Sequence, residues 1–195
     1  MSIIHVLDQA TINQIAAGEV IDRPSSVVKE LVENAIDAKA SVVTIEIKEG
    51  GQKLIRITDN GSGILKDDLS IAFKRHATSK IVKAEDLVSV GSLGFRGEAL
   101  SSIAAIAKVE VITKTKEDFM GNRYVIEGGI EKEYEEIGAP DGTTFLVRDI
   151  FFNTPARQKF LKSVSSETSH ISDIVERLAL SHPEVSIRFI VNGQN

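Results

Sequence analysis

The chain has 195 residues, enough for one sizeable hydrophobic core, and we expect a single domain over residues 1–195. Its 28 acidic and 23 basic residues give a formal net charge of −5, so any contact with nucleic acid must be local. Cysteine is absent, which excludes disulfides and thiolate metal ligands. No window approaches the roughly 18 consecutive apolar residues that a membrane span needs, so we expect a cytoplasmic protein with no membrane partner.

The first elements in chain order are an arm or strand over residues 2–7 and a short helix over residues 11–19. After a break at Pro24, we expect Ser25 or Ser26 to cap a long helix. This helix contains the segment KELVENAIDA at residues 29–38.

The long helix has two different faces. At about 100° per residue, Glu30, Asn34 and Asp37 form one narrow polar stripe. The apolar residues point away from this stripe: Val27, Val28, Leu31, Val32, Ala35 and Ile36. The helix can therefore bury one side in a core while it holds two carboxylates and an amide over a cavity.

A predicted β-hairpin follows the helix. Residues 42–48 alternate apolar and polar side chains, a turn follows, and residues 54–58 return as the partner strand. The hairpin delivers Asp59 at its end, in the sequence DNGSG at residues 59–63. Gly61 and Gly63 let the backbone turn tightly and admit a flat ring close by, although the same residues also suit a plain turn.

The remaining elements are predicted from periodicity and breaking residues: a helix over 67–73, a polar surface loop over 75–85, a helix over 98–107, strands over 109–115, 124–126 and 143–147, helices from Thr154 and over 171–181, and a strand over 185–191. We expect the strands at 124–126 and 143–147 to pair with each other. Strands outnumber the crossover helices that a parallel sheet needs. The predicted fold class is therefore α+β, with a mixed sheet and helices layered on one face.

The glycine-rich segment GSLGFRGEAL at residues 91–100 precedes a predicted helix start. Free backbone amides at such a start can bind phosphate oxygens, although a flexible loop would have the same composition. The GxGxxG and GxxxxGK[ST] patterns of the two commonest nucleotide folds are absent. Magnesium prefers oxygen ligands, so Asn34 suits a metal–phosphate site, and Glu30 suits a base for attacking water. A solvated helix face is the alternative for both residues.

Several longer strings carry a resemblance to a known family: INQIAAGEV, RPSSVVKELVENAIDA, DNGSG, RHATSK, SLGFRGEAL, GTTFLV and FFNTPARQKFL. They resemble the motifs of the GHKL ATPase superfamily. Over essentially the whole chain they are similar to the amino-terminal domain of the MutL family of DNA mismatch repair proteins. The resemblance implies a two-layer α/β sandwich of the GHKL (Bergerat) type, with a mixed, mostly antiparallel sheet.

The same resemblance implies a role for each matching residue. Glu30 would be the general base, Asn34 the Mg²⁺ ligand, Asp59 the partner of the adenine amino group, and Thr143 a support for that contact. The other implied ATP contacts are Gly61, Gly63, Thr78, Ser79, Lys80, Gly94, Phe95, Arg96, Gly97, Glu98, Ala99 and Leu100. The implied cofactors are ATP and Mg²⁺.

The resemblance also implies a switch and its partners. ATP would order a lid and the amino-terminal arm, and the ordered surfaces would pair with a second copy of the chain. The other implied partners are a mismatch-recognition protein, downstream repair enzymes and, in the full-length protein, DNA. A bacterial protein of this type would act at the nucleoid.

The family continues into a second domain, which supplies a lysine toward the terminal phosphate, and into a carboxy-terminal dimerisation region. Neither is in this chain, so we expect robust nucleotide binding and weak or absent hydrolysis.

Two other functions stay open on the residues alone. A different GHKL member, such as a topoisomerase subunit or a chaperone, would share Glu30, Asn34 and Asp59. A non-enzymatic DNA-binding or scaffold module would use the glycine loops only for flexibility. The basic segment at residues 157–162 is a candidate DNA contact, although the acidic total favours a solvated helix face.

Overall fold

The computed structural model describes residues 5–78 and 97–194. Within these residues, one seven-stranded sheet has the order β5-β4-β3-β6-β2-β1-β7. The strands are β1 (Val42–Lys48), β2 (Leu54–Asp59), β3 (Lys108–Lys114), β4 (Gly121–Glu127), β5 (Ile130–Ile137), β6 (Gly142–Arg148) and β7 (Ser186–Val191). Neighbouring strands are antiparallel except β1 and β7, which run parallel.

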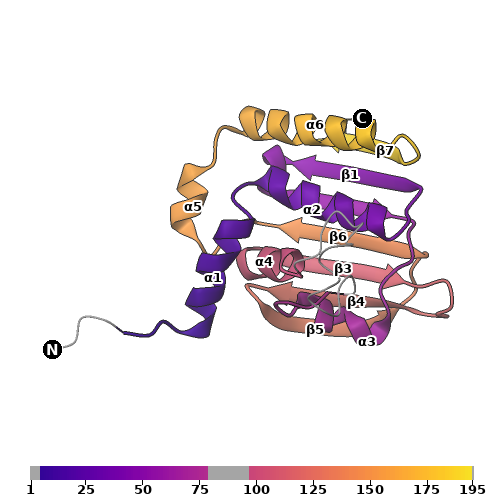
Figure 1. The fold of residues 1–195 in the computed structure, drawn as a ribbon, viewed down its shortest axis with the longest axis horizontal. Helices are drawn as coiled ribbons and strands as arrows, with labels where there is room; N and C mark the ends of the chain where they lie inside the picture. The colour runs from indigo at the N-terminus through magenta and orange to yellow at the C-terminus, as the bar shows by residue number, and fades with distance from the viewer. Residues whose placement is uncertain (1–4, 79–96, 195) are drawn as a thin grey trace, which may run out of the picture.

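The helices form a second layer over one face of this sheet (Figure 1). They are α1 (Gln9–Val20), α2 (Pro24–Asp37), α3 (Lys66–Leu69), α4 (Ala99–Ile106), α5 (Pro155–Phe160) and α6 (Val164–Ser181), with 3-10 turns η1 (Glu49–Gly51) and η2 (Ile71–Phe73). Helix α2 packs on β1 and β2, α4 packs on β3 and β4, and α6 lies beside α2. The predicted α+β class, with a mixed, mostly antiparallel sheet and helices on one face, is confirmed.

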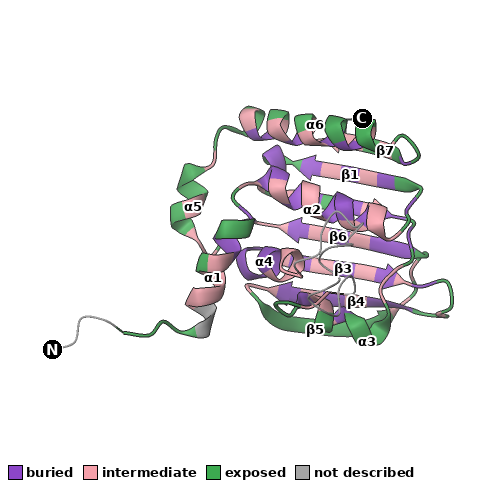
Figure 2. Cartoon of the chain, viewed as in Figure 1, coloured by how far each residue is buried: buried purple, intermediate pink, exposed green. Residues whose placement is uncertain are grey.

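The core lies between the two layers (Figure 2). Strand register places one row of buried side chains across the middle of the sheet: Ile45, Ile57, Phe145, Val111 and Tyr124. The predicted apolar side of α2 covers this row, and five of its six residues are buried while Ile36 is partly buried. Burial of an apolar side chain of this size contributes about 2 kcal/mol to the free energy of folding. Because a rotation of α2 would expose these side chains, the core fixes the direction in which the polar stripe points.

The opposite face of the sheet carries ion pairs. Glu110 accepts hydrogen bonds from Nε of Arg123 at 2.6 Å and from Nη1 of Arg148 at 2.8 Å. Burial acts to raise the pKa of Glu110, but these two guanidinium groups outweigh it and hold the pKa below its ordinary value. Such pairing explains how this face stays polar without a helix layer over it.

The predicted serine cap of α2 is wrong. The helix begins at Pro24, and Arg23 precedes it without a side-chain cap. Proline suits the first helical position because its fixed φ matches a helix and its missing N–H is not needed there. The hydroxyl of Ser26 instead donates to Asp22 at 2.6 Å.

The predicted pairing of residues 124–126 with 143–147 is also wrong. Strand β4 lies between β3 and β5, and β6 lies between β2 and β3. Sequence reasoning missed β5, which is exposed along nearly its whole length and so has no apolar alternation. Its charged side chains suit an edge strand, because charge discourages pairing with another chain.

Candidate functional site

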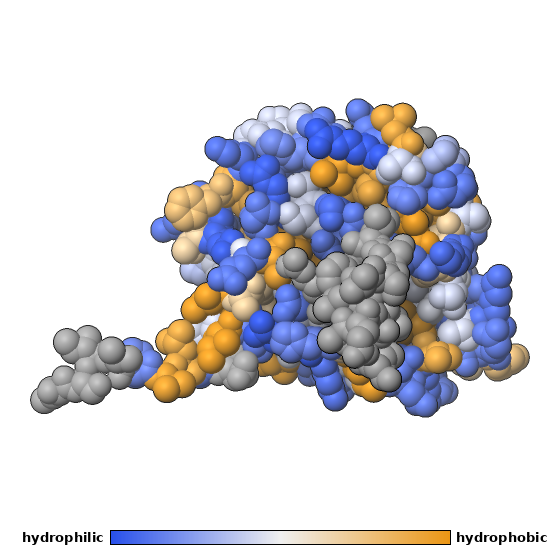
Figure 3. All heavy atoms as spheres, in the orientation of Figure 1, coloured by the Kyte–Doolittle hydropathy of each residue, from blue (hydrophilic) through white to orange (hydrophobic). Residues whose placement is uncertain are grey.

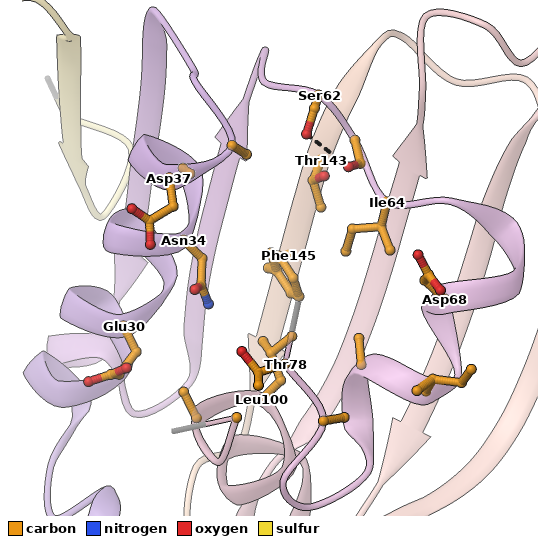
Figure 4. Close-up of a pocket in the computed structure, with 18 of the residues that line it drawn as sticks. Glu30, Asn34, Asp37, Ser62, Ile64, Asp68, Thr78, Leu100, Thr143 and Phe145 are labelled. Atoms are coloured by element: carbon orange, nitrogen blue, oxygen red, sulfur yellow. Dashed lines mark hydrogen bonds between the residues drawn. The ribbon is translucent and has the colours of Figure 1, made fainter. Parts of the chain in front are cut away.

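One cavity of about 1380 Å³ opens between the helix layer and the end of the sheet. Glu30 and Asn34 lie on one side of it, Ile64 and Asp68 on the other, with Thr143 and Phe145 between them (Figure 4). Other predicted site residues also line the cavity: Asp59, Gly63, Thr78, Gly97, Glu98, Ala99 and Leu100. The structure thus brings together residues from five separate segments of the chain.

Some predicted site residues lie elsewhere. Gly61 lines a smaller adjoining cavity of about 280 Å³, next to Asn60 and Ser62. Ser79, Lys80, Gly94, Phe95 and Arg96 lie outside the described residues. Their predicted contacts with ATP stay predictions.

Helix α2 supplies the acid and the amide. Glu30 and Asn34 are one turn apart on the face opposite the buried one. Next to them, Nζ of Lys29 lies 3.6 Å from Glu30 and 3.0 Å from Glu33, whose side chain is buried. The shared ammonium group helps to hold the Glu30 carboxylate in place in the wall of the cavity.

A row of buried polar side chains forms the floor of the cavity and continues beneath it, and Asp59 and Thr143 are the members that line the cavity. Strand register aligns Asp59 on β2 with Thr143 on β6, Thr113 on β3 and Asn122 on β4. All four are buried on the same face as the apolar core. The core therefore changes from apolar to polar at this end of the sheet, which is where a polar ligand can be recognised.

Asp59 lies at one end of this row, with a relative exposure of 7%. Its carboxylate accepts the backbone N–H of Gly61 at 2.8 Å and the backbone N–H of Thr143. Burial raises the pKa of Asp59 above its ordinary value, and these two backbone donors offset only part of that effect. An ionised carboxylate can accept about four hydrogen bonds, so Asp59 can accept a further one from a ligand donor such as an exocyclic amino group.

Sequence reasoning missed Thr113, which connects the elements of the floor. Its Oγ1 lies 3.0 Å from Oγ1 of Thr143, accepts the N–H of Ile64 at 2.9 Å, and donates to the carbonyl of Gly142 at 3.1 Å. The sequence did contain a signal for this residue, because Thr113 continues the core-facing alternation of Val109 and Val111. A polar residue at a core-facing position needs hydrogen-bond partners, which predicts a polar cluster at that point.

The glycine-rich side of the cavity includes the start of α4. Gly97, Glu98, Ala99 and Leu100 line the cavity, and α4 itself begins at Ala99. The carboxylate of Glu98 lies 3.4 Å from Nδ1 of His76, which also lines the cavity. The first amides of a helix have no partner within the helix, so a helix start of this kind can bind an anion.

The side chains that line the cavity could hold Mg²⁺ only if a bound phosphate ligand supplied further oxygens. In the described part of the chain, no group of three or more His, Cys, Asp or Glu side chains could hold a metal ion. The cavity offers the amide oxygen of Asn34 and the nearby carboxylate of Glu30. Magnesium typically takes one or two protein oxygens and completes its shell with phosphates and water, which matches this arrangement.

Comparison with known proteins decides the family. A family model described as histidine kinase-, DNA gyrase B- and HSP90-like ATPase matches residues 22–141. The chain belongs to this ATPase family. The matched segment contains α2, the DNGSG turn and the start of α4, and most of the residues that line the cavity lie within it.

Within this ATPase family, the chain is similar to MutL proteins. It is 65% identical over 191 residues to the DNA mismatch repair protein MutL of Agathobacter rectalis, covering 98% of this chain and 30% of that protein. It is 54% identical over 194 residues to MutL of Clostridium botulinum, covering 100% of this chain and 29% of that protein. The chain thus spans about 30% of the length of these relatives.

Solved structures agree with this assignment. The Aquifex aeolicus MutL ATPase domain complexed with ADP superposes with a TM-score of 0.73 at 35% identity, covering 90% of this chain and 62% of that chain. The amino-terminal domain of a DNA repair protein superposes with a TM-score of 0.77 at 30% identity, covering 94% and 54%. The predicted GHKL ATPase fold of the MutL amino-terminal type is confirmed. In the described ranges, no helix has the length and apolar character to cross a membrane.

Proposed function

We propose that the cavity binds Mg-ATP and that the chain acts as the nucleotide-dependent switch of a DNA mismatch repair protein. One observation carries the proposal: Glu30, Asn34 and Asp59, which are distant in sequence, line a single cavity whose floor is a buried polar row. The similarity to a MutL ATPase domain complexed with ADP supports the choice of an adenine nucleotide.

Each residue takes a role that its position allows. Asp59 accepts the adenine amino group, and Thr143 supports it through its backbone N–H. Asn34 supplies an oxygen to Mg²⁺ on the phosphates, and Glu30, one helical turn away, accepts the proton of the attacking water. The amides at the start of α4 neutralise phosphate charge. When bound there, Mg²⁺ would supply Lewis-acid stabilisation of the negative charge on the phosphate oxygens.

The switch follows from the many charge-assisted contacts of a triphosphate. Those contacts offset the entropy lost when the surrounding segments become ordered. As the resemblance to the MutL family implies, the ordered surfaces would pair two copies of the chain. The paired form would then signal from a mismatch-recognition protein to downstream repair enzymes on DNA, in the bacterial cytoplasm at the nucleoid.

Hydrolysis by this chain alone is proposed to be weak or absent. In the MutL family a second domain supplies a lysine toward the terminal phosphate, which would neutralise charge that develops during hydrolysis. Nucleotide binding needs mainly the floor of the cavity and α2. We therefore expect this chain to bind ATP well while hydrolysing it slowly or not at all.

The test is a titration of the wild-type chain and of Asp59→Asn with ATP and Mg²⁺, followed by calorimetry and light scattering. Asparagine keeps an oxygen for the N–H of Gly61, so the fold should persist, but its amide presents donors to the adenine amino group. We expect saturable wild-type binding with a rise in molecular mass. Loss of the charged hydrogen bond at Asp59 should weaken affinity by about a hundredfold or more.

Asp173→Asn provides a matched control, because Asp173 is exposed on α6 outside the cavity. It should bind nucleotide as the wild type does. A wild-type chain that binds no nucleotide, or an Asp59→Asn variant with unchanged affinity, would favour the DNA-binding or scaffold function instead.

A further inference from the structure

Arg157 occupies the space that a side chain at residue 18 would fill. A Cβ atom on Gly18 would lie 2.2 Å from each of Cζ, Nε and Nη2 of Arg157. The guanidinium group therefore lies directly against the backbone of α1. Gly18 is buried and Arg157 is partly buried, so the contact is sheltered from water.

The segment just before α5 is hydrogen-bonded to α4, and this fixes the position from which α5 and Arg157 begin. The N–H of Phe151 donates to the carbonyl of Ile106 at 2.7 Å, and Nδ2 of Asn153 donates to the carbonyl of Ala105 at 2.8 Å. Both acceptors lie in the last turn of α4. Pro155 then begins α5 and directs Arg157 toward α1, which lies beside α5 at one end of the sheet (Figure 1).

The end of α1 forms one wall of the cavity. Glu19 and Val20, the last residues of α1, line the cavity next to Glu30. Immediately after them, Ile21 is fully buried and its N–H donates to the carbonyl of Ala17 at 2.8 Å. A displacement of α1 would therefore move this wall and the connection into α2.

We propose that Arg157 is a positioning residue of the nucleotide site. By lying on Gly18, it holds the end of α1 against α4, so that Glu19 and Val20 complete the cavity wall. This inference rests on the proposed function, because its effect is read as nucleotide affinity. The proposed role belongs to Arg157 and not to Lys159 or Lys162, which belong to the same basic segment but are exposed.

The space-filling view shows that α1 and the residues before it project from the rest of the molecule (Figure 3). Apolar side chains gather on the projecting part formed by α1 and the residues before it (Figure 3). Val6 and Ile15 are exposed there, with relative exposures of 93% and 53%. The last turn is held to the core by Ala17 and by Ile21, which follows it, and the guanidinium group of Arg157 on Gly18 adds a contact from α5 to the same turn.

A double-mutant cycle of Gly18→Ala and Arg157→Ala tests the proposal. ADP and ATP affinities are measured by calorimetry, and thermal unfolding is measured without nucleotide. If either single substitution lowers the docked fraction of α1 to about a tenth, apparent affinity falls by about tenfold. The double variant should bind no worse than Arg157→Ala, because the new methyl group then displaces nothing and alanine favours a helix.

Lys159→Ala is the matched control, since it removes the same charge from the same helix; its affinity should stay at the wild-type value. Arg157→Lys keeps the charge without the planar group, so it should retain the unfolding temperature but not the full affinity. Additive losses in the cycle, or a lowered unfolding temperature with unchanged affinity, would overturn the inference alone. A wild-type chain that binds no nucleotide would overturn the proposed function as well.

Discussion

Gly142 lies where the floor of the cavity meets the turn after β2, and its replacement by alanine should disturb both. Its φ is +103°, a backbone conformation that L side chains rarely adopt. A Cβ atom there would lie 2.2 Å from the carbonyl oxygen of Asp59 and 2.9 Å from Cα of Asn60. These neighbours are backbone atoms, so relief of the clash requires β6 to move away from the end of β2.

The cost can be estimated from two contributions. The positive φ costs about 1 to 2 kcal/mol, and the overpacking adds roughly 1 to 3 kcal/mol. A total of about 3 kcal/mol should lower the unfolding temperature by roughly 6 to 12 °C for a chain of this size. The N–H of the following residue, Thr143, is a donor to Asp59, so ATP affinity should fall beyond the loss from unfolded protein.

The assay is thermal and urea unfolding, with ATP titration below the transition. Gly138→Ala is the control, because Gly138 is exposed and a Cβ atom there would meet nothing within 4 Å. It should change stability by no more than about 0.5 kcal/mol. If Gly142→Ala unfolds and binds ATP as the wild type does, the close approach of β6 to Asp59 is not what shapes the floor.

Two further predictions concern the ionisable groups of the cavity. Burial raises the pKa of Asp59, and the adenine amino group needs the ionised form. Affinity should therefore be constant above this raised pKa and fall by about tenfold per pH unit below it, whereas Asp59→Asn should bind with a flat profile over the same range. Glu30→Ala should keep ATP binding but lower turnover by roughly 10² to 10⁴-fold in a chain that extends into the second domain, as measured by single-turnover hydrolysis; unchanged turnover would remove Glu30 from the role of base.

Local patterns were sufficient to predict much of the fold and part of the site. The 3.6-residue period of α2 predicted which side is buried, because Leu31 and Val32 could only face the core. The alternation in β1 and β2 predicted the hairpin that places Asp59. These features depend on a single element and its immediate neighbours, so sequence spacing contains them.

Features that depend on distant strands were not predictable in the same way. The position of β6 between β2 and β3 aligns Thr143 with both Asp59 and Thr113, and no local pattern encodes that order. The edge strand β5 lacks alternation because its side chains are exposed. The contact between Arg157 and Gly18 joins residues far apart in sequence, and a basic segment on its own resembles a solvated helix face.

A crystal structure of this chain with Mg²⁺ and a nonhydrolysable ATP analogue would test the central claim most directly. The predicted result has the adenine amino group within hydrogen-bonding distance of the Asp59 carboxylate, and Mg²⁺ between the phosphates and the side-chain oxygen of Asn34. A nucleotide bound outside this cavity, or one whose adenine lies away from Asp59, would contradict the account.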